Sequence, residues 1–589
     1  MRIKGLHLYG TLFLLLTWFA QDGRTDALSS DQRVQSRTFT KTIESAPGKI
    51  LIIDKTQADI VVSGSDENRI SVEAVVEVRD SDKDILEKFL ENSELILEPY
   101  RNGVRIRMIT PRDEGFSDER GEITRFFQKL FGRGDFRLSV STRIQVRVPS
   151  KQDLDIDNKY GDLRIENVEG NLTVENQSGE VEVDGCRGAL DLRNSYASVD
   201  VADFNGSILV QASSGEVTLK NISGRAEVSS SYKPVRFQSI SSDLIVDSQS
   251  ADVMGSDVMG DCQITTSYKT VDVSGVRGRL DVKGQSCTVS AYGVSGDAVI
   301  ENSYKPVTVD SIGGSLDVRG QSSMVTVSRA AKDVSIQTSY KSVKVDGVNG
   351  LLTIQGQSSP VDVSNVKDRV TIRTSYKEIQ VAHVGASLDV DGSSCSVTIR
   401  DVKGDVSILS SYKDVIVEQV DGSLNVRTGS GSVTANDILK GATIVSSYKP
   451  IQVQRISGDL DVDGSSCSVS VDEVGGDVKI SNSYKYVIVK GTSGSIWVRG
   501  DSSPIEVSGI RTLPENAQIE LITKYKPITL SLPGNADVTI SATTEYGKIR
   551  SEFPVYLDDK DNKNVRIELG KATAFVRLET SGDIIVKKQ

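Results

Sequence analysis

A Tyr-Lys pair that recurs along the chain is the most regular set of side chains able to do chemistry. In the stretch NSYKPVTVDSIGGSLDVRGQSS, residues 302–323, the pair is Tyr304-Lys305. Tyrosine faces can stack on sugar rings, and lysine ammonium groups can pair with carboxylates or phosphates. The candidate binding residues are Tyr232, Lys233, Tyr268, Lys269, Tyr304, Lys305, Tyr340, Lys341, Tyr376, Lys377, Tyr412, Lys413, Tyr448, Lys449, Tyr484 and Lys485.

The same pair also has a purely structural interpretation. The residue one half-repeat after each tyrosine is usually serine, as at Ser286, Ser322 and Ser394. A ring packed over its small neighbours would fill volume that two stacked rings could not share. We expect this packing role first, a linear binding platform second and self-association third. Packing and binding are compatible if the ring packs while its hydroxyl group and the lysine stay exposed.

Histidine chemistry is almost excluded by composition. The chain has two histidines, His7 in the N-terminal signal segment and His383, which stands alone. A His-based catalytic triad or a His-rich metal cluster needs more than that. We expect His383 to be an exposed or hydrogen-bonded structural residue.

Aspartates recur in an L-D-V motif, at Asp281, Asp317, Asp389 and Asp461. A polysaccharide lyase or glycosidase would instead gather particular carboxylates and basic residues in one cleft. Because these aspartates repeat uniformly on the outward side of strands, we expect them to solvate the surface and not to act in catalysis. There is also no Asp-rich nonapeptide of the calcium-binding kind. The sequence therefore predicts no catalytic residue, no metal site and no cofactor, with a carbohydrate-active enzyme as the alternative.

The five cysteines predict no disulfide framework. Cys287, Cys395 and Cys467 share one repeat position, 108 and 72 residues apart. In stacked 18-residue coils those intervals are roughly 29 and 19 Å, whereas a disulfide needs Cα atoms within about 7 Å. We interpret these three as small fillers, and Cys186 and Cys262 as residues at core positions of the repeat.

Composition and the N-terminus indicate export. The net charge is −12 and the charges are interspersed, which argues against a nucleic-acid partner because that needs a basic face. Arg2 and Lys4 precede an apolar run at residues 11–20, followed by a polar stretch to Ala27. The run is short for a membrane span of about 20 residues, so we expect a signal peptide over residues 1–27, with an uncleaved anchor as the alternative. The mature chain is then expected to have no transmembrane helix.

A strict period explains where the Tyr-Lys pairs come from. Ten tyrosines are each 36 residues apart, from Tyr160 to Tyr484. Each unit divides into two 18-residue halves, because Val307, Val309 and Leu316 are matched one half-repeat later by other apolar residues. The half-repeat reads V-x-V-x-x-(I/V/A)-x-x-x-(L/V)-x-(V/I), which contains two short strand signals. Such strands need identical neighbours to bury their apolar side, as in a solenoid.

The period predicts an all-β parallel β-helix with one coil per 18-residue half-repeat. About 20 coils at about 4.8 Å each would give a rod on the order of 95 Å long. A propeller is disfavoured because ten blades exceed the usual range and 36 residues are few for a blade. The crossover rule favours right-handed winding, and the left hand stays open.

The remaining segments are expected to close the ends of the solenoid, whose open edges would otherwise aggregate. We divide the chain into the signal peptide 1–27, an N-terminal β-rich cap with short amphipathic helices at 28–150, the β-helix at 151–510 and an irregular C-terminal β cap at 511–589. The cap segments DKDILEKFLEN and TRFFQKLF carry the helical patterns. Phe126, Phe127, Leu130 and Phe131 would form one apolar face, expected to pack on the first coils, with membrane or partner contact as the alternative.

A family resemblance appears in the turns of the two ends. The sequences Ser178-Gly179-Glu180-Val181 and Ser581-Gly582-Asp583-Ile584 are S-G-(D/E)-(I/V) turns. With them the chain resembles the bacterial putative-adhesin family of β-strand repeats. The resemblance implies a β-helical envelope protein of unassigned molecular activity, and fold alone does not establish function. The middle repeats depart from it, because they carry Tyr-Lys in place of Ser-Gly.

Taken together, these patterns favour a non-enzymatic exported scaffold in the periplasm, at the cell surface or outside the cell. Its expected partner is an envelope glycan, another surface polymer or a protein, and self-association stays open. A carbohydrate-active enzyme is the first alternative, and a structural spacer or filament subunit is the second.

Overall fold

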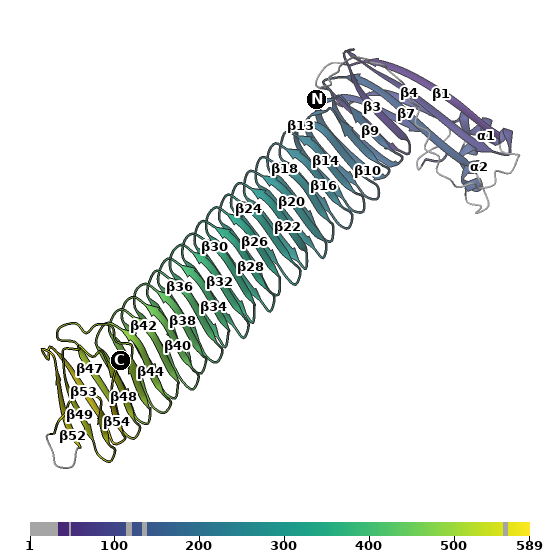
Figure 1. Ribbon diagram of the computed structural model, residues 1–589. Helices are drawn as coiled ribbons and strands as arrows, with labels where there is room; N and C mark the ends of the chain where they lie inside the picture. Colours follow the sequence, from purple (N-terminus) through teal and green to yellow (C-terminus); the bar gives the residue numbers. More distant parts are fainter. Residues whose placement is uncertain (1–32, 46–48, 114–120, 132–137, 558–562) are drawn as a thin grey trace, which may run out of the picture.

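The computed structural model describes residues 33–45, 49–113, 121–131, 138–557 and 563–589. It is a long rod of stacked β coils with an antiparallel extension at its N-terminal end (Figure 1). The predicted signal peptide lies outside the described residues. Among the helices that are described, none is long and apolar enough to cross a membrane.

Each coil contributes one strand to each of two parallel sheets, here sheets A and B. In the stretch 302–323, β24 (Val307–Ile312) lies in sheet A and β25 (Leu316–Gly320) in sheet B. The next coil repeats them as β26 (Val325–Ala330) and β27 (Val334–Ser339). Val307 pairs with Val325 and Leu316 with Val334, the 18-residue offset that the sequence predicted. The solenoid has about 20 such turns, so the predicted fold class is confirmed.

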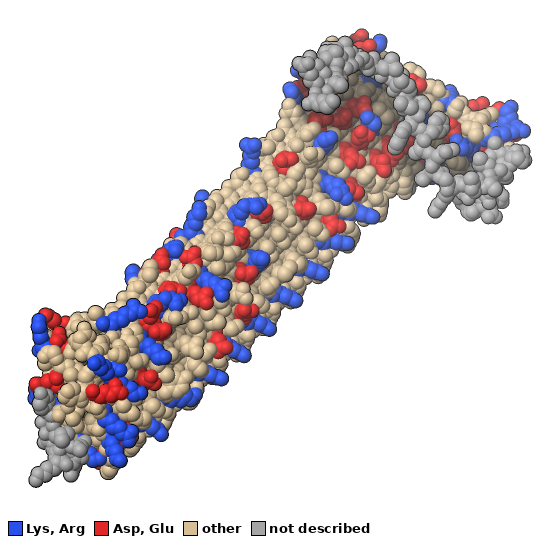
Figure 2. Space-filling view, viewed as in Figure 1, with Lys and Arg blue, Asp and Glu red and all other residues tan. Residues whose placement is uncertain are grey.

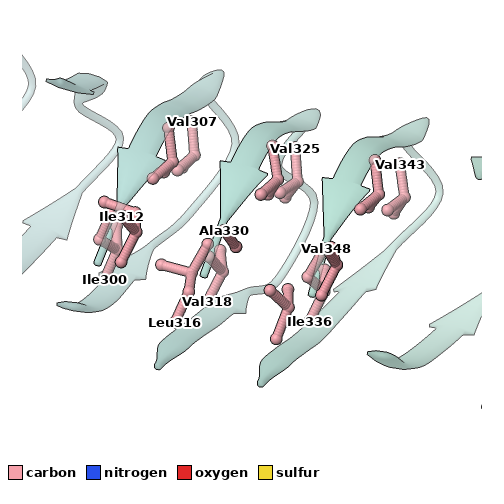
Figure 3. Close-up of a cluster of buried hydrophobic side chains, with 14 of the residues drawn as sticks. Ile300, Val307, Ile312, Leu316, Val318, Val325, Ala330, Ile336, Val343 and Val348 are labelled. Carbon is pink, nitrogen blue, oxygen red and sulfur yellow. The ribbon is translucent and has the colours of Figure 1, made fainter. Parts of the chain in front are cut away.

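The core is a column of apolar side chains between the two sheets. Val307, Val309, Ile312, Leu316 and Val318 are each at most 1% exposed, and the residues between them face outward or lie at corners. Figure 3 shows equivalent side chains of successive coils lying one behind another between the strands. Alternation along each strand puts every second side chain inside, which is why short V-x-V and L-x-V segments suffice.

A left-handed residue bends every coil where sheet A passes to sheet B. Ser311, Arg329, Gly347, Asn365 and His383, which occupy the same position of five successive coils, have φ between +55° and +77°. The bend turns the following apolar residue, such as Ile312 in its coil, into the core. The position accepts many residue types, so its conformation is imposed by the stacking of coils rather than by local preference.

The N-terminal end of the rod is covered by strands that run on from the first coil. That coil consists of β2 (Ile50–Thr56) and β3 (Asp59–Ser65), which stack on β8 (Asp153–Tyr160) and β9 (Leu163–Glu166). On its open side β2 pairs with β6 (Gly103–Ile109), and β5 (Glu94–Tyr100) pairs with β6 in turn. Likewise β3 pairs with β7 (Ser139–Pro149). Next to β7 lies β4 (Arg69–Asp80), and β4 pairs in turn with β1 (Arg33–Glu44). Antiparallel pairing thus ends the stack.

Two short helices form a small apolar cluster in this extension. The predicted segment folds as α1 (Lys83–Glu91), which buries Leu86, Phe89 and Leu90. The second is α2 (Glu122–Phe131). Phe127 is fully buried, with its ring edge-on to that of Phe89 at 5.6 Å between centroids. Phe127 therefore packs on α1 within the cap, whereas packing on the first coils was expected. The side chains of Leu130 and Phe131 lie outside the described residues.

The C-terminal end stacks its coils out of sequence order. After β45 (Ile496–Gly500) and β46 (Ile505–Ser508) come β47 (Gln518–Thr523) and β48 (Ile528–Leu532). The coil that stacks on them is the last of the chain, β53 (Ala574–Thr580) and β54 (Ile584–Lys588). Beyond it lie β49 (Val538–Thr544) and β50 (Ile549–Ser551), with β52 (Asn564–Leu569) antiparallel at the edge. Parallel stacking therefore runs past both predicted boundaries of the β-helix, residues 151 and 510.

Core packing should dominate the stability of each coil. Replacing the buried Ile336 with Ala should lower the free energy of unfolding by about 2–5 kcal/mol, because it removes apolar contacts and leaves a cavity. The neighbouring Gln337 faces outward, and its replacement with Ala should change stability by no more than about 0.5 kcal/mol. Urea unfolding of the two variants compares them; equal losses would contradict the assignment of the inner face.

Candidate functional site

The tyrosine edge is the corner of the rod formed by the eight pairs from Tyr232-Lys233 to Tyr484-Lys485. Each pair lies where sheet B passes back to sheet A, as Tyr304-Lys305 lies between β23 (Ala298–Asn302) and β24. The eight tyrosines are 62–70% exposed. Because coils stack in one register, the pairs recur at every second coil, about 9.6 Å apart.

The expected packing role of the tyrosine rings is wrong. A ring that covered its small neighbours would be largely buried, whereas Tyr304 is 62% and Tyr376 70% exposed. Ser286, Ser322 and Ser394, the small residues one half-repeat after a tyrosine, are only partly buried. Large side chains at this corner therefore project into solvent, and their size has to be explained by something other than filling the core.

Five of these tyrosines adopt a backbone conformation that disfavours bulky residues. Tyr268, Tyr304, Tyr340, Tyr376 and Tyr448 have φ between +62° and +72°. Glycine would adopt this region without steric cost, whereas a bulky side chain in it is a genuine outlier. The main chain is held there by hydrogen bonds, since the Tyr340 amide donates to the Gln357 carbonyl oxygen at 2.8 Å. Strain of this kind is concentrated at functional sites.

A buried polar side chain two residues before each tyrosine fixes the corner. Asn302, Thr338 and Thr374 are 1–6% exposed. Thr338 Oγ1 donates to the Ser323 carbonyl oxygen at 2.8 Å, and Asn302 Nδ2 donates to the Cys287 carbonyl oxygen at 2.7 Å. The same bond, from a residue to the carbonyl 15 positions earlier, recurs at Thr266, Thr374, Ser410, Ser446 and Asn482. Each bond ties one coil to the previous coil inside the corner.

Small residues fill the inside of the alternate corners. Cys287, Ser323, Ser359, Cys395 and Cys467 are fully buried, so the filler interpretation of these cysteines is confirmed. The hydroxyl groups of Ser323 and Ser359 have no hydrogen-bond partner among the described residues, so the position selects small volume rather than polarity.

All five cysteines are free thiols in this structure. Cys186 and Cys262 are 1% exposed in the core, as predicted. Burial raises the pKa of the Cys262 thiol to about 12, and it also raises the pKa values of the other four. Because the thiolate is the nucleophile, these cysteines are poor candidates for covalent chemistry.

The carboxylates of the repeats are largely engaged in structure. Asp297 Oδ1 accepts a hydrogen bond from the Ser315 backbone N–H at 2.8 Å, and Asp333, Asp405 and Asp477 make the same bond to the next coil. The outward Asp317 pairs with Arg319 at 2.6 Å. His383 Nδ1 lies 2.8 Å from Asp401 Oδ2 and is exposed, as expected of a structural histidine. In the part of the chain that is described, no three His, Cys, Asp or Glu residues are placed to hold a metal ion.

Two shallow hollows, here called the sections of the polar groove, lie at the end of sheet B beside the corner that carries the repeated tyrosines, over residues 265–337 and 157–213. One section has a volume of about 540 Å³, and its lining includes Ser267, Lys283, Gln285, Glu301 and Gln321. The same coil positions line a second section of about 580 Å³ at the N-terminal end of the rod. The groove offers amide and hydroxyl groups next to the exposed rings.

The N-terminal section of the groove gathers more acidic and basic side chains than the section lined by Lys283, Glu301 and Arg319. It is lined by Asp157 and Glu175 on adjacent coils, by Lys55 and Lys159, and by Asp113 from the cap. Burial and the nearby carboxylates of Glu175 and Asp54 raise the pKa of Asp157. Burial also raises the pKa of Asp113. Figure 2 shows acidic side chains clustered near this end.

Comparisons with known proteins identify no family. No family model matches the chain, and no curated protein matches it. Among solved structures, one described as a "putative cell adhesion protein" from Clostridium sporogenes is 9% identical, with a TM-score of 0.18. That alignment covers 42% of this chain and 100% of the other chain. At such a TM-score the likeness carries no argument, and the adhesin resemblance remains an expectation.

The buried polar residues and the groove were not predicted from the sequence. The signal for the former was present, because Asn, Thr or Ser always stands two residues before the repeated tyrosines from Tyr160 to Tyr484. Their burial follows from strand alternation, which turns this position inward.

Two substitutions at one corner should distinguish the contribution of the buried hydrogen bond to stability from that of the small buried residue. Thr338→Val removes the donor to the Ser323 carbonyl and should lower the free energy of unfolding by about 1–3 kcal/mol, because a buried acceptor is left unpaired. Ser323→Ala removes an unpaired buried hydroxyl and should be neutral or stabilising. Equilibrium unfolding tests both; a larger loss for Ser323→Ala would contradict this account.

The thiols provide a further test of burial. In the folded protein at pH 8 we expect iodoacetamide to leave all five cysteines unmodified over hours, whereas in concentrated urea all five should react. Mass spectrometry counts the modified thiols. Rapid labelling of Cys287, Cys395 or Cys467 in the folded protein would show that the corners are open.

Proposed function

We propose that this chain is an exported, non-enzymatic scaffold that binds an extended glycan or similar polymer of the cell envelope along the tyrosine edge. The observation that carries the proposal is the row of eight exposed Tyr-Lys pairs at one repeat position. In this role the protein would act as an adhesin or as an envelope-binding protein.

Three features of the edge support binding rather than a structural role. The rings are exposed, so they contribute little apolar burial to the fold. Five of them stand in a conformation that glycine would adopt more easily, so the side chain is retained despite a backbone cost. The corners are fixed by buried hydrogen bonds, so the backbone that carries the rings is held in place before a ligand arrives.

Repetition converts weak contacts into useful affinity. A single ring stacked on a sugar gives a weak interaction, but neighbouring rings on a rigid rod meet the next units of the same polymer at high effective concentration. A polymer with a repeat close to the spacing of two coils could contact several pairs without bending. Two coils rise about 9.6 Å, which is comparable to the length of a disaccharide.

Removing rings from the edge tests this proposal. The combined change of Tyr304, Tyr340, Tyr376 and Tyr412 to Ser should weaken binding to purified cell-wall material on the order of 10²–10³-fold, at about 1 kcal/mol for each stacked ring. The melting temperature should stay unchanged because the rings are exposed. Sedimentation of the mature protein with insoluble wall polymers measures the binding.

The matched control removes four exposed apolar side chains away from the edge. Met259, Tyr292, Leu351 and Leu439 are 42–57% exposed, and their replacement with Ser should leave binding unchanged. Loss of stability with unchanged binding in the edge variant would reject the proposal. Concentration-dependent assembly of the wild-type rod, abolished by the same edge variant, would favour a filament subunit.

Export is supported by the sequence of the N-terminal segment alone. The proposal requires that residues 1–27 direct the chain across the membrane, into the periplasm, to the cell surface or outside the cell. N-terminal sequencing of protein recovered from cell fractions locates both the processed end and the compartment. Recovery of the unprocessed chain in the cytoplasm would remove the envelope from the proposal.

One observation favours a second candidate function, a carbohydrate-active enzyme. The N-terminal cavity gathers Asp157, Glu175, Lys55 and Lys159, and the pKa of Asp157 is raised, as is often the case for a general acid. Release of short oligosaccharides from a polysaccharide by the wild-type protein, lost in Asp157→Asn, would establish it.

A further inference from the structure

The lysines of the tyrosine edge form a row of cations without carboxylate partners. Across the described residues, none of the eight, from Lys233 to Lys485, lies within ion-pair distance of an Asp or Glu. Some arginines on the faces are paired, for example Arg319 with Glu301 at 3.0 Å and Arg455 with Asp437. Other cations of the faces, such as Arg373, Arg427 and Lys367, lie outside ion-pair distance of the described carboxylates, as the edge lysines do. Figure 2 shows evenly spaced basic side chains along one long edge of the rod.

What distinguishes this row is its regular spacing along a protein of net charge −12. Its lysines stand at every second coil, about 9.6 Å apart, which is close to the Debye length of about 10 Å at 0.1 M salt. Neighbouring ammonium groups therefore repel each other only weakly. Lys485 Nζ donates to the Tyr448 carbonyl oxygen at 3.1 Å, so that lysine lies back along the edge rather than across it.

The groove section beside Tyr268 and Tyr304 adds neutral hydrogen-bonding groups, next to the charged side chains of Lys283, Glu301 and Arg319. Ser267, Gln285, Ser303 and Gln321 line the same section of groove, next to Tyr268 and Tyr304 in sequence. Amides and hydroxyl groups bind sugar hydroxyl groups, which a bare polyphosphate chain does not present. The edge thus combines aromatic faces, widely spaced cations and hydroxyl-binding groups in one line.

We infer that the polymer bound by the tyrosine edge is a linear anionic polysaccharide that carries about one acidic group per disaccharide-length repeat. This inference rests on the proposed function and specifies its ligand. One cation per two coils matches a sparsely charged chain. Duplex DNA carries one charge per about 1.7 Å of its axis, and surfaces that bind nucleic acid are much more densely basic.

The charge pattern also fixes where the polymer lies. In the first two repeats Gly161 and Ala197 stand where later repeats have lysine. The absence of these edge lysines sets the N-terminal limit, and the groove carboxylates do not, because Glu301 in the footprint occupies the same coil position as Glu175. The footprint therefore extends from Lys233 to Lys485 and leaves out the N-terminal coils.

Hyaluronan, which has one carboxylate per disaccharide, is a suitable probe, and its carboxyl-reduced form is the neutral control. The mature protein should bind hyaluronan at least tenfold more tightly than the reduced polymer. Changing Lys305, Lys341, Lys377 and Lys413 to Gln should weaken hyaluronan binding at least tenfold and lower the slope of log affinity against log salt by roughly half. Calorimetry or interferometry over a salt series measures both.

The matched control removes the same charge elsewhere. Lys332, Lys367, Lys440 and Lys490 are exposed and lie away from the edge, and their replacement with Gln should change affinity less than twofold. Equal binding of hyaluronan and its reduced form overturns the inference but not the proposed function. If the protein binds neither hyaluronan nor its reduced form, the inference is also overturned. Sedimentation with wall polymers then tests the proposed function separately. Equally tight binding of single-stranded DNA also overturns it.

Lysine acetylation with and without hyaluronan maps the footprint. Lysines from Lys233 to Lys485 on the edge should be protected, whereas Lys159 should react equally in both samples. Protection of Lys159, or of the off-edge control lysines to the same degree, would overturn the assigned path.

Discussion

The hydrogen-bonded register between coils, which shifts both sheets by the same 18-residue offset, is the constraint on which the rest of the structure depends. No coil could bury its apolar side alone, because two strands of about five residues enclose no core. Each coil takes its core, its bend and its hydrogen bonds from its neighbours. The register also forces equivalent residues into straight columns, which is how one position of the repeat becomes one edge of the rod.

The same register decides where the chain tolerates change. Extra residues enter at corners without disturbing the stack: between β46 and β47 the chain is longer than in a regular coil, yet Ile496 still pairs with Ile519. At the C-terminus the last coil stacks between β47/β48 and β49/β50, because backbone pairing needs a matching strand edge and not the next strand in sequence. Antiparallel strands at both ends occupy edges that would otherwise invite aggregation.

The tyrosine edge separates the structural inside of a corner from the side chains that project outside it. Inside it, a buried Asn, Thr or Ser and a small residue satisfy the hydrogen bonds and the volume of the corner. Nothing in the fold then requires the large side chain outside. Tyr304 is largely exposed and, with Lys305, stands at a corner whose inside is already filled, so both side chains are available for the polymer binding that we propose.

Much of the fold could be predicted from the sequence because a strict period leaves few architectures open. The 18-residue halves predicted the coil, the core positions and the buried Cys186 and Cys262 correctly. The orientation of Tyr304 could not be predicted, because the pattern of large and small residues is the same whether the ring covers its neighbours or projects from a left-handed corner. The polar groove depends on how outward side chains of separate coils meet, which no single repeat reveals.

The central claim is that the pairs of the edge lie on one straight line with a constant rise. Three double variants carry spin labels at Lys305→Cys and at Lys377→Cys, Lys413→Cys or Lys449→Cys, which lie four, six and eight coils away. The native thiols are buried and should not be labelled. Double electron–electron resonance should give distances near about 19, 29 and 38 Å, rising by about 9.6 Å per repeat. Distances that stay constant, or that do not increase linearly with repeat number, would contradict the account.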